Sequence, residues 1–250
     1  MSHYYYDLHL HSCLSPCADD DMTPANIVGM ASLNGLQIIA LTDHNSAANC
    51  PPFFTEARRR GLIPIGGMEL TVSEDIHAVC LFPDLESTMA FDRFVAGRRA
   101  RIKNRTEIFG RQILYGEDDH PIGEIEELLI PATDISLSEA HAEVTRRGGV
   151  CYPAHVDRTA NGILAVLGDL PPEPRFTAYE LHDAERQATL LLRHPPLSAL
   201  PCLVSSDAHR LEDIAEACVS LPLPKREREE QIRQDLISFL RGENGGISYG

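Results

Sequence analysis

The chain has 250 residues, a formal net charge of −15 and seven cysteines. Its length suits one main domain with a single substantial core, because α/β barrels of about 200–250 residues commonly fold as one domain. The strongly negative charge argues against a general nucleic-acid coat protein and against a membrane-surface module, since both usually present a basic face to their anionic partners.

The start of the chain has no charged segment followed by an apolar stretch, so we expect no secretory leader. No later run approaches the length that spans a bilayer, so no membrane partner is expected. An odd number of cysteines without a leader fits reduced thiols better than a disulfide framework. We therefore expect a cytoplasmic protein.

Short apolar runs rich in β-forming residues alternate with segments of helical pattern. This alternation favours parallel strands joined by crossover helices. We expect strands over residues 4–8, 36–41, 62–65, 78–82, 150–152, 178–181 and 202–204. The first helix is expected to begin after the capping residue Thr23 and to end at Gly35, and a second helix to end at Arg60.

The alternation lapses between residues 86 and 147, where the sequence is charged and mostly of helical pattern. We interpret residues 86–147 as a small helical insertion subdomain, residues 1–85 and 148–241 as the barrel domain, and residues 242–250 as a tail. Four arginines and a lysine gather at 98–105 within the insertion. They either hold additional phosphates of a longer substrate or form an ordinary solvated helix face.

Histidines and carboxylates stand where the expected strands end. His9 and His11 alternate at the end of the first strand, and a period of two points both imidazoles to the same side. Asp43 and His44 directly follow the second strand, and Glu69 follows the third. Because the carboxyl ends of parallel strands form one rim of a barrel, these side chains are expected to meet around one pocket.

Further candidates accompany other strands. His155 comes just after the run at 150–153, and Asp207 and His209 close the run at 202–206. His77 differs, because it precedes its strand. It reaches the pocket either from a bend or from a strand that runs against its neighbours.

Imidazoles and carboxylates together are ligands of zinc, manganese or iron, and a bridging carboxylate can hold two cations close enough to share one hydroxide. Each residue alone also has an ordinary explanation, such as a capping aspartate, an exposed carboxylate or a hydrogen-bonded core histidine. Their joint position at strand ends favours a cluster of divalent metal ions. Such a cluster suits the hydrolysis of phosphate esters, since metal ions lower the pKa of water and neutralise charge on the phosphoryl oxygens.

The motifs that carry these residues resemble those of the PHP (polymerase and histidinol phosphatase) superfamily. They occur in the family's order and are Asp-Leu-His-Leu-His-Ser from Asp7, Leu-Thr-Asp-His from Leu41, Gly-Met-Glu from Gly67, His77, Pro-Ala-His from Pro153 and Ser-Asp-Ala-His from Ser206. The resemblance covers nearly the whole chain apart from the insertion. It implies a distorted (β/α)7 barrel around a centre of three divalent metal ions, which are manganese, iron or zinc.

The resemblance also implies the ligands, residue by residue. The matching residues form three sets: His9, His11, Glu69 and Asp207 for one ion; Glu69, His77 and His155 for another; and His44 with His209 for the third. The third set is expected to gain an acidic residue from the loop after the first strand. Many relatives carry Ser-Asp-Gly there, whereas this chain has three aspartates at 19–21. Counting back from Thr23 selects Asp19, with Asp20 as the alternative.

Two further residues are expected near the ions. Asp43 suits a group that orients a ligand or helps a proton move better than it suits a ligand. Arg158, three residues past His155, is either a phosphate clamp, because its planar fork can grip two oxygens, or an ordinary surface arginine.

Within the superfamily the chain looks most like the small stand-alone phosphoesterases that act on nucleotides and short RNA. The leading hypothesis is a phosphomonoesterase or exonuclease-type phosphodiesterase whose nucleophile is a metal-bridging hydroxide. Its partner is then a phosphorylated small molecule or a short nucleic acid; no stable DNA complex is expected, and no sequence pattern bears on oligomeric state. The alternatives are a histidinol-phosphate or other small-metabolite phosphatase and, in another class, a PHP module that binds without catalysis.

Overall fold

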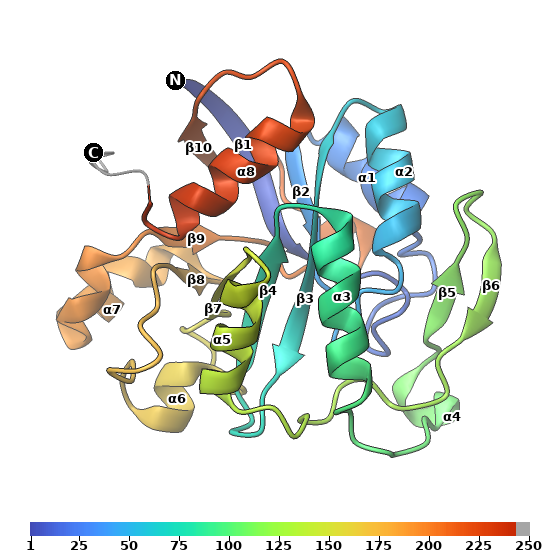
Figure 1. Ribbon diagram of the computed structural model, residues 1–250, viewed down its shortest axis with the longest axis horizontal. Helices are drawn as coiled ribbons and strands as arrows, with labels where there is room; N and C mark the ends of the chain where they lie inside the picture. The colour runs from blue at the N-terminus through green and yellow to red at the C-terminus, as the bar shows by residue number, and fades with distance from the viewer. Residues whose placement is uncertain (244–250) are drawn as a thin grey trace.

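The computed structural model describes residues 1–243. Its main sheet is curled and has the strand order β10-β1-β2-β3-β4-β7 (Figure 1). These strands are β1 (Ser2–Leu10), β2 (Ile38–Leu41), β3 (Ile63–Thr71), β4 (His77–Phe82), β7 (Val150–Pro153) and β10 (Ser220–Leu223). A separate parallel pair consists of β8 (Tyr179–Leu181) and β9 (Cys202–Val204).

Hydrogen bonds at the strand ends join this pair to the sheet and close a distorted barrel. The backbone amide of Val156, just after β7, donates to the Glu180 carbonyl of β8 at 2.9 Å. On the other side, the amide of His11 donates to the Ala208 carbonyl after β9 at 3.0 Å, and Leu10 forms an isolated parallel bridge with Ala208. The predicted distorted barrel is therefore confirmed, with β1, β2, β3, β4, β7, β8 and β9 as its wall.

Helices cover the outside of the barrel and one of its ends. They are α1 (Pro24–Leu33), α2 (Cys50–Arg59), α3 (Leu85–Ala96), α4 (Thr106–Phe109), α5 (Leu137–Arg146), α6 (Ile163–Leu167), α7 (Gln187–Arg193) and α8 (Glu229–Leu240). Short 3-10 turns lie at Ala184–Arg186, Pro195–Ala199 and Leu211–Asp213. The expected cap of α1 is present, since the Thr23 hydroxyl accepts the Asn26 amide at 3.2 Å. None of the helices within residues 1–243 has both the length and the apolar character needed to cross a membrane.

The alternation of side chains along the strands divides the core into two layers. Ile63 of β3 shares a buried cluster with Leu236 of α8, so α8 closes the barrel at the end where β1, β2 and β3 begin. Leu41 of β2 belongs to the other cluster, with Ile27 of α1 and Phe53 of α2 on the outside of the sheet. The opposite end of the barrel, where β1, β2 and β3 finish, is left for polar side chains.

β4 runs antiparallel to both of its neighbours, β3 and β7. The cause is a tight turn after β3, in which the Val72 amide donates to the Ile76 carbonyl at 3.0 Å and Asp75 has a φ of 61°. A tight turn joins antiparallel strands, whereas a parallel pair needs a long crossover. The expectation of parallel strands is therefore wrong at β4. His77 enters the rim because its strand runs against its neighbours, which is one of the two routes foreseen for it.

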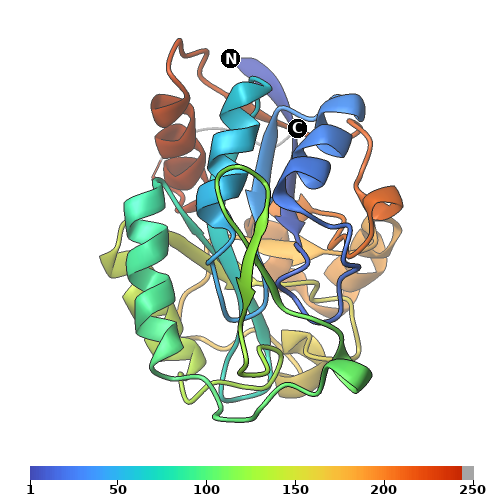
Figure 2. The ribbon, with the colours of Figure 1, turned by 90° about the vertical axis from the view of Figure 1, so that its right-hand side faces the viewer.

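Residues 86–147, expected as a helical insertion, hold most of α3, all of α5 and a β-hairpin between them. α3 packs on β3 and β4, and α5 packs on β4 and β7. The antiparallel hairpin, β5 (Ile113–Tyr115) and β6 (Pro121–Glu124), is not part of the main sheet and lies at one edge of the molecule (Figure 1, Figure 2). The boundaries of the insertion and of the barrel domain stay a prediction, and the predicted tail beyond residue 243 lies outside the described residues.

Candidate metal centre

The buried carboxylate of Glu69 lies at the centre of the polar rim. β3 extends well past the expected strand at 62–65, so Glu69 lies within the strand rather than after it. By the period of two, Glu69 shares the face of Ile63 and Ile65, which line the barrel interior. Its side chain is 1% exposed. The strand therefore carries this carboxylate from the apolar interior into the rim.

Both carboxylate oxygens of Glu69 face imidazole nitrogens. Oε1 lies 2.8 Å from Nδ1 of His77 and 3.0 Å from Nε2 of His155. Oε2 lies 3.0 Å from Nδ1 of His44 and 3.4 Å from Nε2 of His11. A carboxylate approached on both oxygens by ring nitrogens from different strands has the arrangement of a bridging metal ligand.

Asp207, which follows β9, completes the rim. Its Oδ1 lies 3.4 Å from Nε2 of His9 and 3.1 Å from Nε2 of His11. Within residues 1–243, donor atoms that lie within 4.8 Å of one another form three overlapping groups: His9, His11, Glu69 and Asp207; His44, Glu69 and His77; and His11, His44 and His209. The structure thus brings together residues whose positions span almost the whole chain.

Several of these donor atoms are buried without a hydrogen-bond partner. Within residues 1–243 they include Nε2 of His9 and His11, Nδ1 of His44 and Oδ1 of Asp207. Buried polar atoms are nearly always satisfied, and the free lone pair of a neutral imidazole is what a metal ion binds. The nitrogen and oxygen donors therefore fit divalent cations of the manganese, iron or zinc type.

Mutual electrostatics shift the pKa values of the cluster. Burial lowers the pKa of His9, but the charges of nearby carboxylates, first that of Glu180, outweigh it and raise the pKa well above its usual value. For His44 burial dominates and lowers the pKa to about 4. Burial also opposes ionisation of Glu69, yet the surrounding histidines hold its pKa well below the usual value. Strong shifts in both directions within one site are typical of functional residues.

A hydrogen-bond chain from Asp43 fixes the tautomer of His11. The Ser15 hydroxyl donates to Oδ1 of Asp43 at 2.7 Å. The same hydroxyl oxygen then accepts from Nδ1 of His11 at 2.9 Å and from the His44 backbone amide at 3.1 Å. With the proton on Nδ1, the Nε2 lone pair of His11 is directed to the cluster. Asp43, expected to orient a ligand, lies behind Ser15 in this chain.

Glu180 of β8 orients His9 in the same way. Nδ1 of His9 donates to Oε1 of Glu180 at 2.8 Å, and this oxygen also accepts the His155 backbone amide at 3.2 Å. Glu180 is not among the residues that the motifs single out. A signal was nevertheless present, because a carboxylate inside the apolar run at 178–181 is buried at a cost unless it finds a partner.

Two of the candidate ligands have a left-handed backbone. The φ angle is 26° at His155 and 54° at Asp207. Residues other than glycine seldom adopt positive φ, and such strained positions concentrate at functional sites. The turns after β7 and β9 therefore hold these two side chains toward the rim at a cost in backbone energy.

Comparison with known protein families shows to which family the chain is related. The family model described as "PHP domain" matches residues 7–169, which is more than half of the chain. The chain belongs to the PHP domain family. The match spans the motifs from His9 to His155, whereas Asp207 and His209 lie beyond it and meet the other PHP residues through the fold. The family predicted from the motifs is confirmed.

Curated relatives match over shorter stretches. The chain is 34% identical over 77 residues to an error-prone DNA polymerase of Symbiobacterium thermophilum, which is 31% of this chain and 7% of the polymerase. It is 34% identical over 73 residues to a 3′,5′-nucleoside bisphosphate phosphatase of Chromobacterium violaceum, which is 29% of this chain and 25% of the phosphatase. The chain therefore covers a quarter or less of the length of these relatives.

A solved structure shares the fold over nearly the whole chain. It is the lesion-specific endonuclease PfuEndoQ from Pyrococcus furiosus, with a TM-score of 0.67 and 18% identity. The match covers 98% of this chain and 57% of the endonuclease. At this level of identity the likeness concerns the fold alone.

Arg158 reaches the candidate metal centre from the loop after β7. Its Nη1 lies 2.6 Å from Oδ2 of Asp207, and its Nη2 lies 3.3 Å from Nδ1 of His182. Together with Glu69 and His209 it lines a small cavity of about 130 Å³, here called the metal cavity. This position favours the phosphate-clamp interpretation over an ordinary surface arginine.

Asp19 and Asp20 belong to none of the three donor groups found within residues 1–243. The Asp19 side chain is 54% exposed and lies 3.7 Å from Nε of Arg210, and the Asp20 side chain is 59% exposed and lies 3.7 Å from Arg111. The Asp19 amide donates to the His209 carbonyl at 3.0 Å, so the loop after β1 runs beside the candidate metal centre. The acidic ligand of the third ion stays a prediction.

Proposed function

We propose that the chain is a metal-dependent phosphoesterase that hydrolyses phosphate esters of nucleotides or short oligonucleotides. The observation that carries this proposal is the buried Glu69 carboxylate, whose two oxygens face ring nitrogens from β1, β2, β4 and β7 or the turns that follow them. Bound divalent ions would supply a water of lowered pKa and positive charge opposite the phosphoryl oxygens.

The ligands that we propose are the histidines and carboxylates of the rim. They are His9, His11, His44, Glu69, His77, His155, Asp207 and His209. Except for His77 and His209, each is nearly or fully buried, so the protein holds their donor atoms in place before a cation arrives. Such preorganisation suits a site that must keep its ligands fixed during hydrolysis.

Other residues of the chain would hold the ester and keep the ligands oriented. Arg158 would bind non-bridging phosphate oxygens, since it lines the metal cavity beside Glu69 and His209. Ser15 and Glu180 would keep the ring protons of His11 and His9 on Nδ1, which leaves both Nε2 atoms free for cations.

The nucleotide class of substrate is supported by the names of the curated relatives, a nucleoside bisphosphate phosphatase and a DNA polymerase. The structural neighbour is described as an endonuclease, so the expected lack of a stable DNA complex stays a prediction. The eight donors gathered at the rim, most of them buried, argue against a module that has lost catalysis.

Hydrolysis by the manganese-loaded protein tests the proposal. The substrates are p-nitrophenyl phosphate, its bis-ester, a nucleoside 3′,5′-bisphosphate, a 5′-phosphorylated short RNA and histidinol phosphate. We expect turnover of the nucleotide substrates that EDTA abolishes and that Glu69→Gln lowers at least about a hundredfold, because the bridging charge is lost. Glu117→Gln, at an exposed position, is the matched control.

The outcomes separate the alternatives. A strong preference for histidinol phosphate would move the substrate to small metabolites. No turnover of any ester by protein that contains manganese would contradict the phosphoesterase and favour a binding module. Turnover that survives Glu69→Gln would contradict the proposed centre.

A further inference from the structure

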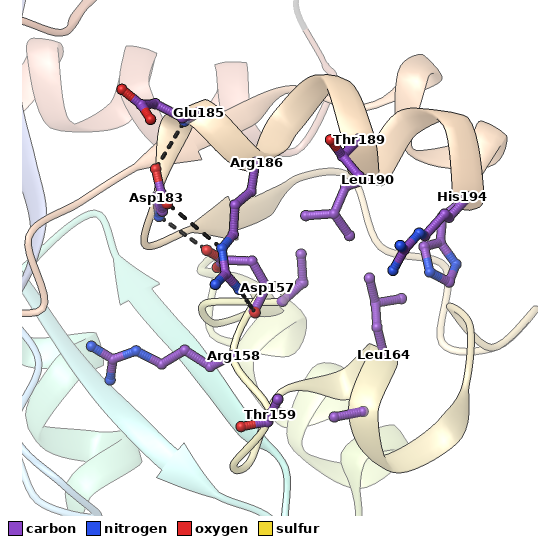
Figure 3. A pocket seen from close by; sticks show the side chains of 13 residues that line it. Asp157, Arg158, Thr159, Leu164, Asp183, Glu185, Arg186, Thr189, Leu190 and His194 are labelled. Atoms are coloured by element: carbon purple, nitrogen blue, oxygen red, sulfur yellow. Dashed lines mark hydrogen bonds and ion pairs between the residues drawn. The ribbon is translucent and has the colours of Figure 1, made fainter.

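A groove leads away from the candidate metal centre. An outer cavity of about 540 Å³ lies between α6 and α7 (Figure 3). A third cavity, of about 330 Å³, lies next to both the metal cavity and the outer cavity. It shares Arg158 and Ala160 with the metal cavity, and Asp157, Arg158 and Arg186 with the outer cavity. Arg158 lines all three cavities, which therefore lie next to one another along the groove.

The metal cavity alone does not accommodate a nucleotide. Its volume is about 130 Å³, whereas sites that enclose small organic ligands measure roughly 300–1,000 Å³. The outer cavity, at about 540 Å³, falls within that range. A substrate whose phosphorus lies at the metal centre must place its leaving alcohol elsewhere, and the groove adjoins that centre at Arg158 and Ala160.

The outer cavity combines apolar walls with an unpaired arginine. Leu164 of α6 and Leu190 of α7 point toward the same space from opposite sides (Figure 3). Arg193, three residues after Leu190, lines the same cavity and has no carboxylate partner within residues 1–243. Apolar walls accept the faces of a planar base, and a free guanidinium binds a phosphate.

The carboxylates near the start of the groove are occupied by the backbone. Asp157 accepts the amides of His182 and Asp183 at 2.9 and 3.0 Å. Asp183 in turn accepts the Glu185 amide at 2.9 Å (Figure 3). These bonds shape the wall of the groove. Arg193 supplies a positive charge at its outer end that no such bond engages.

The basic stretch at 98–105 offers less to a substrate. Several of its arginines already pair with carboxylates: Arg98 with Glu139, Arg99 with Asp92 and Arg101 with Glu127. A phosphate would have to displace these partners, whereas it would displace no carboxylate of residues 1–243 at Arg193. Lys103 and Arg105 line a separate cavity that shares no residue with the groove.

We propose that this groove binds the leaving group of the substrate as a single-stranded nucleic-acid segment. Its first nucleoside packs between Leu164 and Leu190, and its next phosphate meets Arg193. The inference rests on the proposed function. It narrows the substrate from a general phosphate ester to one with at least one nucleotide beyond the bond that is cleaved.

The test uses two variants at exposed positions of the cavity wall and a control for each. Arg193→Glu reverses the charge, with Arg93→Glu on α3 as its control; Ala165→Trp fills the cavity, with Val166→Trp on the same helix as its control. We expect both cavity variants to lower kcat/KM for a 5′-phosphorylated trinucleotide roughly tenfold and to change that for p-nitrophenyl phosphate less than about twofold, as for loss of one charged contact.

Binding of a nuclease-resistant phosphorothioate trinucleotide with a fluorescent label gives a readout independent of turnover. Fluorescence anisotropy on manganese-loaded protein should show a Kd raised roughly tenfold in both cavity variants but in neither control. If the wild type cleaves the trinucleotide and all variants behave alike, the groove is not the subsite while the proposed function stands. If the wild type cleaves no ester, the proposed function fails, and equal trinucleotide binding by all variants would overturn the groove as well.

Discussion

Removal of the Glu180 charge tests whether the orientation of His9 sets the affinity for metal. Glu180→Gln keeps the size of the side chain but removes the charge that meets Nδ1 of His9 at 2.8 Å. A hydrogen bond to a charged group contributes about 1.5–3 kcal/mol, and about 1.4 kcal/mol is a tenfold change in Kd. We therefore expect manganese affinity to fall roughly 10- to 100-fold, as for other residues that orient metal-binding histidines.

Thermal unfolding with and without manganese measures this loss. A cation that binds the folded state contributes about 4.1 kcal/mol at a thousand times its Kd and about 2.7 kcal/mol at a hundred times. At a fixed manganese concentration the variant should lose about 1.4–2.8 kcal/mol of this stabilisation. For a domain of this size about 1 kcal/mol shifts Tm by roughly 2–4 °C. The Tm with metal should therefore fall by roughly 3–11 °C more than the Tm without metal does.

Glu185→Gln, at an exposed position close to Glu180 in the chain, is the control. Competition with a chelating dye gives the manganese Kd directly. If Glu180→Gln binds manganese as tightly as the wild type and gains the same Tm from it, then Glu180 does not position His9 and the argument is wrong. A Tm that falls equally with and without manganese would show that Glu180 mainly stabilises the fold.

Three other substitutions test separate features. Ser15→Ala should lower kcat/KM for p-nitrophenyl phosphate about 10- to 100-fold, because Nδ1 of His11 loses its acceptor; an unchanged value would refute the tautomer argument. Asp19→Asn should leave the number of bound ions per chain, measured by elemental analysis, unchanged, since its side chain is 54% exposed; loss of one ion would support the ligand assigned from the motif. Gly67→Ala should lower the free energy of unfolding in urea by about 1–3 kcal/mol, because its Cβ would lie 2.7 Å from a side-chain atom and 2.8 Å from a backbone atom of β4. Gly123→Ala, with no atom within 4 Å, should have little effect.

The positions of the barrel strands were predictable, but the extent and direction of two of them were not. Apolar runs mark where strands lie and carry no sign of direction, so the turn at Asp75 was needed to reveal that β4 is antiparallel. Gly66 and Gly67 argue against a continued strand, since glycine weakens strands. In the structure they allow Thr88 and Leu81 to approach β3 closely, and the strand continues past Glu69.

The histidines of the rim were predictable because their spacing at strand ends is local. The roles of Glu180 and Ser15 were not, because they depend on bonds to the ring nitrogens of His9 and His11, and the first of these bonds joins residues 171 positions apart. The apolar run around Glu180 indicates only that this carboxylate needs a partner, not which one. β10 was not predicted from the sequence either, because Pro222 lies within a short apolar run and a proline argues against a central strand. It pairs with β1 as an edge strand, where a proline is tolerated.

The candidate ligands begin at His9 on β1 and end at His209 beyond β9, and each group found within residues 1–243 combines residues from three strands or the turns that follow them. A chain that has not yet placed β9 beside β1 lacks Asp207 and His209 in the rim, so of the three groups only that of His44, Glu69 and His77 is complete. Because metal binding is coupled to folding in such sites, uptake of the full set of cations would follow closure of the barrel rather than precede it. Metal loading would then report that the last wall strand has docked, and truncated or misfolded chains would compete poorly for the cell's manganese, iron or zinc.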